Sequence, residues 1–133
     1  MKFKLDHVNI TVKDLEQSIR WYQDILGMRV VEQGKTGLGK RWAIVERDDS
    51  MICMTEYPNY KSANLMDNTE FFQIYHFGFR TPDKKAWEDV VSEHNLKLYY
   101  GGVNEYPNSL SWYIKDPSGH TIEVSYSESK NLF

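Results

Sequence analysis

This sequence contains one cysteine, Cys53, among its 133 residues. A single thiol cannot close a disulfide within the chain, and it cannot build the cage of several cysteines that holds a structural zinc ion. No apolar stretch approaches the roughly 18 residues that cross a bilayer. The first six residues also lack the apolar region of a signal peptide. We therefore expect a cytoplasmic protein that does not enter the membrane.

Runs of charge of one sign are absent too. The chain carries 16 Lys and Arg against 19 Asp and Glu, a formal net charge of −3, and these residues are dispersed along it. Nucleic acids and anionic membranes bind proteins through concentrated lysine and arginine, so we expect neither as a partner. With 41% hydrophobic and 26% charged residues, the composition is that of a globular domain.

What the sequence does contain is one order of elements, strand-helix-strand-strand-strand, in each half. Residues 5–12 alternate apolar and polar side chains, as a half-buried strand does. Asp14 is a predicted helix N-cap, and Gly27 fits the end of that helix. Three strands are then expected, over residues 28–32, 40–46 and 51–56. The second half starts again with a strand, a helix capped by Asp83 and three strands, the strands expected over residues 74–80, 96–100, 109–114 and 121–126.

Matching residues of the two halves are separated by nearly constant intervals. His7 and His76 are 69 residues apart, as are Asp14 and Asp83, whereas Trp42 and Trp112, and Cys53 and Glu123, are 70 apart. Four matches in the same order indicate a duplicated unit. We predict an α+β fold in which two βαβββ modules form curved mixed sheets around a cavity. The modules span about residues 3–57 and 71–127 of a single domain, joined by a polar, turn-rich linker over residues 58–70.

Two histidines stand at equivalent places in this repeat. His7 shares its strand phase with Asn9 and Thr11, and His76 shares its phase with Gly78 and Arg80. Each histidine is therefore expected on a polar face, away from the face that packs on the helix. A single strand histidine is more often a hydrogen-bonding partner than a ligand, but two at equivalent positions favour a metal site.

Glu123 supplies a third candidate ligand. It shares its phase with Thr121 and Ser125 in the last predicted strand, while the residues between them are apolar. A carboxylate in a strand interior is costly to bury unless it is paired or bound to a metal, although an exposed edge strand would also accommodate it. Two histidines and one carboxylate with open positions suit one divalent ion of iron, manganese, nickel or zinc.

Two stretches of the chain resemble a known superfamily. The first runs from Leu5-Asp6-His7-Val8 to Leu26-Gly27, and the second from Trp112 to Glu123 through Asp116-Pro117-Ser118-Gly119-His120. Together they resemble the vicinal oxygen chelate superfamily, which includes glyoxalase I, fosfomycin-resistance proteins, extradiol dioxygenases and bleomycin-resistance proteins. The resemblance covers nearly the whole chain.

The resemblance implies a set of site residues. The metal ligands of the family match His7, His76 and Glu123, and a tyrosine that contacts substrate in two branches matches Tyr113. Tyr113 would also be consistent with a strand tyrosine that covers the core. Glyoxalase I has a glutamate as fourth ligand, and the internal repeat places Cys53 there. Solvent or substrate is expected at this position, with Cys53 and nearby Glu56 as alternatives.

The resemblance also implies an activity and an assembly. We expect metal-dependent chemistry on a small substrate that chelates the ion through neighbouring oxygens, with the ion acting as a Lewis acid on an oxyanion. An isomerase, lyase or transferase is favoured over a dioxygenase, because the additional active-site histidine of the extradiol enzymes has no match. The competing hypothesis is a metal-free binding protein like the bleomycin-resistance proteins. A homodimer with shared active sites is expected, in which His7 meets His76 and Glu123 of the partner chain.

Overall fold

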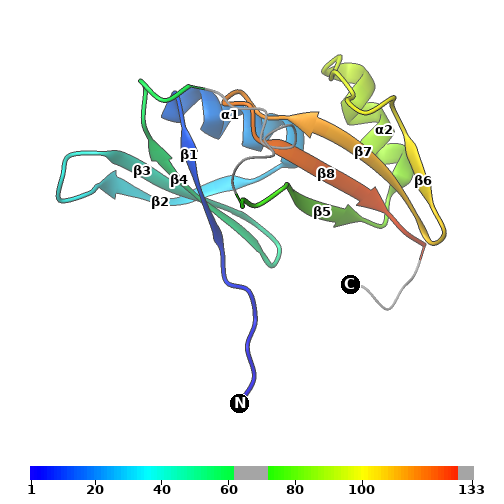
Figure 1. Ribbon diagram of the computed structural model, residues 1–133, viewed down its shortest axis with the longest axis horizontal. Coiled ribbons are helices and arrows are strands. Elements are labelled where there is room, and N and C mark those ends of the chain that lie inside the picture. The colour runs from blue at the N-terminus through cyan, green and yellow to red at the C-terminus, as the bar shows by residue number, and fades with distance from the viewer. Residues whose placement is uncertain (62–71, 129–133) are drawn as a thin grey trace. The chain divides into compact units, whose positions relative to one another are not determined.

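The computed structural model describes residues 1–61 and 72–128 (Figure 1). The chain divides into two compact units, Met1–Ser62 and Ala63–Phe133. The first unit contains β1 (Val8–Val12), α1 (Leu15–Leu26), β2 (Arg29–Lys35), β3 (Arg41–Arg47) and β4 (Ser50–Glu56). The second contains β5 (Phe77–Thr81), α2 (Lys84–Glu93), β6 (Asn104–Tyr106), β7 (Ser109–Lys115) and β8 (Thr121–Tyr126). This order confirms the α+β class and the repeated βαβββ arrangement.

Each unit has one four-stranded mixed sheet. The strand orders are β1-β4-β3-β2 and β5-β8-β7-β6 (Figure 1). In each sheet the first and last strands of the unit pair in parallel, and the other neighbours pair antiparallel. The parallel ladders begin at Val8 and Phe77, each one residue after a candidate histidine. His7 and His76 therefore stand just before their strands rather than within them.

Side chains at the helix ends define where each helix starts and stops. The Asp14 side chain accepts a hydrogen bond from the Gln17 backbone N–H at 2.8 Å, and Asp83 accepts one from Ala86 at 2.9 Å. Both are N-caps, as predicted. Gly27 ends α1 in the left-handed region, with φ of 65°. A residue without a Cβ adopts that conformation at little cost, so the predicted stop is also confirmed.

The core lies on one face of each sheet. In the first unit α1 packs on β2, β3 and β4. The fully buried side chains of that unit include Tyr22, Ala43, Val45 and Met54. In the second unit Trp112, Ile114 and Ile122 are almost completely buried. The opposite faces carry the alternate residues, as the period of a strand requires, and they hold the candidate site.

Two expectations about the strands are wrong. Residues 96–100 do not form a strand, and the strand of that region is β6, Asn104–Tyr106. The reason is local backbone geometry, because Tyr100, Gly101 and Gly102 all have positive φ (57°, 83° and 100°). Three consecutive residues with positive φ turn the chain, so the extended backbone of the next strand starts only at Asn104.

The proposed equivalence of Trp42 and Trp112 is also wrong. Trp42 pairs with Thr55, whereas Trp112 pairs with Val124. Because Cys53 and Glu123 occupy matching positions, the partner of Trp42 in the repeat is Ser111, which pairs with Ser125. The connection between the last two strands is one residue longer in the second unit, so a constant interval misaligns β3 with β7.

Two further points concern the chain as a whole. A linker is expected over residues 58–70, and residues 62–70 of it lie outside the described part of the chain. In the described part, the Tyr60 N–H donates to the Tyr57 carbonyl and forms a turn. Among the described residues, no helix combines the length and the apolar character needed to cross a bilayer.

Candidate metal centre

His76 and Glu123 meet on the polar face of the second sheet. His76 directly precedes β5, and Glu123 lies in the middle of β8, opposite Gly78 in the parallel register. The His76 Nε2 is 2.8 Å from the Glu123 Oε2. Their side chains are 25% and 21% exposed, so the pair is shielded but reachable. The structure thus brings together two of the three predicted ligands.

The second carboxylate oxygen of Glu123 is held by two hydroxyls. Ser111 of β7 donates to Oε1 at 2.6 Å, and Ser125 of β8 donates to the same atom at 3.0 Å. Burial alone would raise the pKa of the Glu123 carboxyl, but these hydrogen bonds and the one to His76 outweigh it and lower the pKa below its usual value. Glu123 is therefore a fixed carboxylate at neutral pH, with Oε2 directed at His76.

Gly78 makes room for this carboxylate. A Cβ at position 78 would lie 3.2 Å from the Glu123 carbonyl oxygen and 3.4 Å from the Glu123 Cβ. The contact with the backbone oxygen is tight enough that the neighbouring strand would have to move by a few tenths of an ångström. The small residue between His76 and Arg80 therefore has a packing reason that concerns Glu123 directly.

Tyr113 lies beside the pair. It is the antiparallel partner of Glu123, it is 7% exposed, and its ring centroid is 5.6 Å from that of His76. Its hydroxyl is 2.9 Å from the hydroxyl of Tyr106 on β6. Burial, followed by the hydrogen bond to Tyr106, raises the Tyr113 pKa above the ordinary 10.0. The phenol is therefore protonated at neutral pH and can act as a hydrogen-bond donor.

The matching place in the first unit has a different composition. His7 is exposed, and its Nδ1 is 2.7 Å from the Asp6 Oδ2. A carboxylate on one ring nitrogen orients an imidazole so that the other nitrogen can bind a metal. Cys53 takes the position that Glu123 has in the second unit, opposite Asn9. Burial raises the pKa of the Cys53 thiol, which favours the protonated form over a thiolate ligand.

Glu56, the other alternative for the fourth ligand, is already bound to Leu15 and Arg41. Its Oε2 accepts the Leu15 N–H at 2.8 Å and an Arg41 N–H at 2.6 Å, and its Oε1 accepts from the Arg41 Nε at 3.0 Å. Arg41 also pairs with Glu16 of α1. Glu56 therefore joins β4 to the start of α1 on the helix-packed side of the sheet, opposite in strand phase to Cys53. It also belongs to a group of three carboxylates with Asp14 and Glu16, which Arg41 already neutralises in part.

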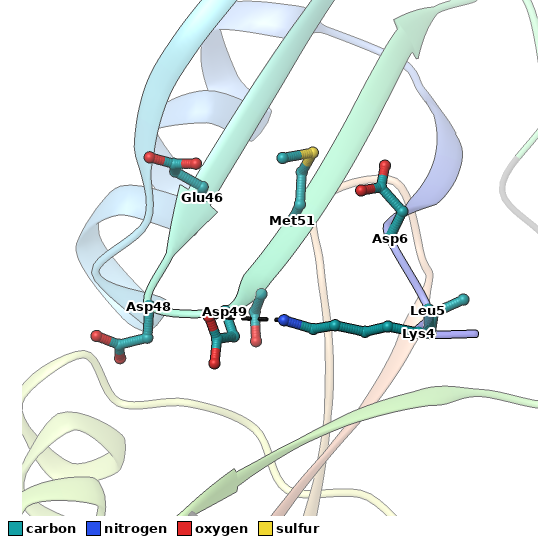
Figure 2. A pocket seen from close by; sticks show the side chains of 8 residues that line it. Lys4, Leu5, Asp6, Glu46, Asp48, Asp49 and Met51 are labelled. Carbon is teal, nitrogen blue, oxygen red and sulfur yellow. Dashed lines mark ion pairs between the residues drawn. The ribbon is translucent and has the colours of Figure 1, made fainter. Parts of the chain in front are cut away.

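A shallow hollow near the N-terminus has acidic walls. Figure 2 shows its lining, with Asp6 on the segment before β1 and Glu46 at the end of β3. Lys4 pairs with Asp49 at 3.7 Å, Glu46 pairs with Arg29, and Asp6 contacts His7. The side chains of Lys4, Asp49 and Asp6 are 74%, 93% and 80% exposed, so these are solvated surface pairs.

The His76–Glu123 pair fits a divalent ion. Two ligands at right angles around one ion, with bonds of about 2.1 Å, stand about 3 Å apart, close to the observed 2.8 Å between Nε2 and Oε2. The set of imidazole nitrogen and carboxylate oxygen suits the first-row divalent metals. The His76 Nδ1 is buried and has no hydrogen-bond partner among the described residues.

Several residues around this centre were not singled out as site residues from the sequence. Ser111 and Ser125 share the strand phases of Tyr113 and Glu123, so the alternation carried a signal for the face on which they lie. The contact of both hydroxyls with one carboxylate depends on the register between β7 and β8. Tyr106 belongs to the strand that the sequence placed elsewhere, and so its contact with Tyr113 had no sequence signal.

Curated proteins resemble this chain in sequence. Among curated proteins, the metallothiol transferase FosB of Staphylococcus saprophyticus is 27% identical over 125 residues, covering 90% of this chain and 74% of that protein. The catechol-2,3-dioxygenase of Bacillus subtilis is 25% identical over 123 residues, covering 90% of this chain but only 40% of that protein.

Solved structures share the fold. A glyoxylase/bleomycin resistance protein/dioxygenase domain from Frankia sp. EAN1pec has a TM-score of 0.75 at 19% identity, covering 98% of this chain and 96% of that one. The fosfomycin resistance protein FosX of Listeria monocytogenes, complexed with Mn(II) and sulfate, has a TM-score of 0.68 at 16% identity, covering 96% and 94%. The profile of the Glyoxalase/Bleomycin resistance protein/Dioxygenase superfamily matches residues 4–124, and the chain belongs to that superfamily.

Proposed function

We propose that this protein is a metal-dependent enzyme acting on a small substrate that chelates the ion through neighbouring oxygens. The observation that carries the proposal is the His76–Glu123 pair, with nitrogen and oxygen 2.8 Å apart and the carboxylate fixed by two serine hydroxyls. The names of the relatives support it, since one is a metallothiol transferase and another was solved with Mn(II).

Three side chains would hold the ion. His76 and Glu123 supply two ligands from the second unit, and His7, oriented by Asp6, supplies the third from the first unit. The hydrogen bonds from Ser111 and Ser125 keep the Glu123 carboxylate ionised and fix its orientation. Zinc, nickel, manganese and iron all accept this donor set.

The remaining chemistry belongs to Tyr113. When bound, a divalent ion acts as a Lewis acid on a substrate oxygen. Tyr113 then donates a hydrogen bond to the oxygen on which negative charge develops. Its hydroxyl keeps its proton at neutral pH, and it lies 2.9 Å from the Tyr106 hydroxyl, which can donate to it and leave the Tyr113 proton for the substrate. We place the reaction among isomerase, lyase or transferase chemistry rather than dioxygenation.

The fourth coordination position is assigned to solvent or substrate. Glu56 is bound to Arg41 and Leu15, and the Cys53 thiol is favoured in its protonated form. Cobalt substitution tests this assignment, because a thiolate ligand gives strong sulfur-to-metal charge-transfer absorption. That absorption in the wild type, lost in Cys53→Ala, would establish Cys53 as a ligand and overturn the assignment.

We further propose a homodimer with shared sites, in which His7 of one chain completes the site of the other. The test refolds a His7→Ala chain together with a Glu123→Gln chain. Shared sites give each mixed dimer one intact site and one doubly damaged site, so tight metal binding returns. Mixed dimers verified by mass spectrometry that do not recover metal binding would assign each site to a single chain.

The main experiment measures metal content and affinity. Protein purified without a histidine tag or chelator should retain about one divalent ion per chain, and Glu123→Gln should lose most of it while its circular dichroism is unchanged. Glu105→Gln, on exposed β6 of the same unit, is the matched control and should behave as wild type. Undiminished metal in a His7→Ala/Glu123→Gln double variant would disprove the site. A metal-free wild type that still binds small ligands would indicate a binding protein instead.

A further inference from the structure

A groove of about 710 Å³ lies where β5, β6 and β8 end and β7 begins, and Arg80, Tyr106 and Ser109 line it from the polar face. Its volume falls in the range of small-molecule sites. All of its lining residues belong to the second unit, and they include Arg80, Tyr106, Tyr126 and Glu128. Of these residues, the function proposed above uses only Tyr106, which contacts Tyr113.

The sheet register connects the groove to His76 and Glu123. Gly78 pairs with Glu123, and Arg80, two residues further along β5, pairs with Ser125. Two residues of a strand span roughly 6.6 Å, and side chains two apart share a face. Arg80 therefore extends from the face that carries Glu123, about two residues away along the strand.

Arg80 is an exposed cation that no carboxylate of the described chain neutralises. Each ion pair among residues 1–61 and 72–128 involves another cation. The guanidinium forks onto carboxylates with two parallel hydrogen bonds. Glu128 also lines the groove, and its Oε1 accepts from the Tyr126 hydroxyl.

Tyr106 links the groove to the candidate centre. Its side chain lines the groove, and its hydroxyl is 2.9 Å from that of Tyr113, which is the β7 partner of Glu123. A molecule that reached from Glu123 to Arg80 would therefore pass along the polar row of Ser125 and Ser111 and beside Tyr106.

We infer that Arg80 and this groove bind a carboxylate at the far end of the substrate. The substrate class is then a small molecule with neighbouring oxygens at one end and a carboxylate at the other. This inference rests on the proposed function for the chelating end. Arg80 acts as the specificity-determining residue, since it distinguishes a carboxylate from an apolar tail.

Calorimetric titration of the Mn(II)-loaded protein with two matched six-carbon ligands tests the inference. 2-Hydroxyadipate and 2-hydroxyhexanoate share the chelating end, and the first alone has a distal carboxylate. We expect 2-hydroxyadipate to bind about tenfold or more tightly than 2-hydroxyhexanoate, as a charge-assisted bidentate contact provides. Arg80→Gln should remove this preference, Arg29→Gln in β2 should keep it, and Glu128→Gln should increase it. Equal affinities in the wild type, or an unchanged preference in Arg80→Gln, would overturn the inference.

A second arm separates this inference from the function on which it rests. In metal-free protein, nuclear magnetic resonance follows the Arg80 side-chain Nε–Hε signal during titration with glutarate, a dicarboxylate without the neighbouring hydroxyl. A saturable shift, absent in Arg80→Gln, supports the carboxylate site even if no Mn(II) binds. The absence of any shift while both hydroxy acids bind the Mn(II) protein equally would refute the carboxylate site and leave the metal centre standing.

Discussion

The Nε2 of His76 lies 2.8 Å from the Oε2 of Glu123, although 46 residues separate them in the chain. The other oxygen of the same carboxylate accepts hydrogen bonds from Ser111 and Ser125. All the hydrogen bonds that the described residues make to this carboxylate therefore come from the second unit. Two of the three candidate ligands are thus positioned by one βαβββ module alone.

The two serine hydroxyls should strengthen metal binding without touching the ion. Ser111→Ala and Ser125→Ala each leave Glu123 with one hydroxyl fewer, and we expect metal affinity to fall by about 10–100-fold, as for other second-layer contacts. Competition with a fluorescent chelator measures the change. Ser92→Ala on exposed α2 is the control. Wild-type affinity in both site variants would show that Glu123 needs no such support.

Gly78 should be required for the position of Glu123. Gly78→Ala places a methyl group 3.2 Å from the Glu123 carbonyl oxygen, so β5 and β8 must separate slightly. We expect a loss of about 1–3 kcal/mol in the free energy of unfolding, as overpacking usually costs, together with weaker metal binding. Gly37→Ala has nothing within 4 Å of its new Cβ and is the matched control. Urea denaturation checks stability, and equal behaviour of the two variants would contradict the expectation.

Tyr113 should make the protein less stable at high pH. Its pKa in the folded protein lies above the ordinary 10.0, chiefly because of burial. Above pH 10 the unfolded chain loses this proton while the folded protein retains it, so the free energy of unfolding falls as the pH rises. In Tyr113→Phe the fall should be shallower than in the wild type, and Tyr60→Phe, an exposed tyrosine, should leave it unchanged. Measurement of the free energy of unfolding of the three proteins between pH 8 and 11 tests this prediction.

Glu56 should contribute stability that is lost in acid. The Arg41 hydrogen bond, with that of the Leu15 N–H, holds the pKa of this carboxyl below the ordinary 4.5. The contribution is therefore present above pH 4.5 and disappears as the pH falls through the lowered value. Glu56→Gln keeps an acceptor for Leu15 but not the charge, so its stability should depend less on pH between 5 and 3. Glu93→Gln, on α2, serves as control, and a slope in Glu56→Gln equal to that of the wild type would exclude the effect.

The sequence alone determined the order of the elements and most of their positions, although not that of β6. Strand alternation, the caps at Asp14 and Asp83 and the stop at Gly27 are properties of neighbouring residues, and all of them appear in the structure. The same alternation placed Glu123 and Gly78 on the polar face, because a strand's period depends only on its own residues.

Tertiary structure decided what depends on pairing between distant segments. The register of β7 with β8 places the Ser111 and Ser125 hydroxyls on one oxygen of Glu123, and a one-residue difference between the units moves Trp112 opposite Val124. The start of β6 depends on the positive φ of Tyr100, which leaves no mark in hydrophobic periodicity. Backbone pairing fixes such contacts to the residue, whereas the sequence pattern specifies only the face on which each side chain lies.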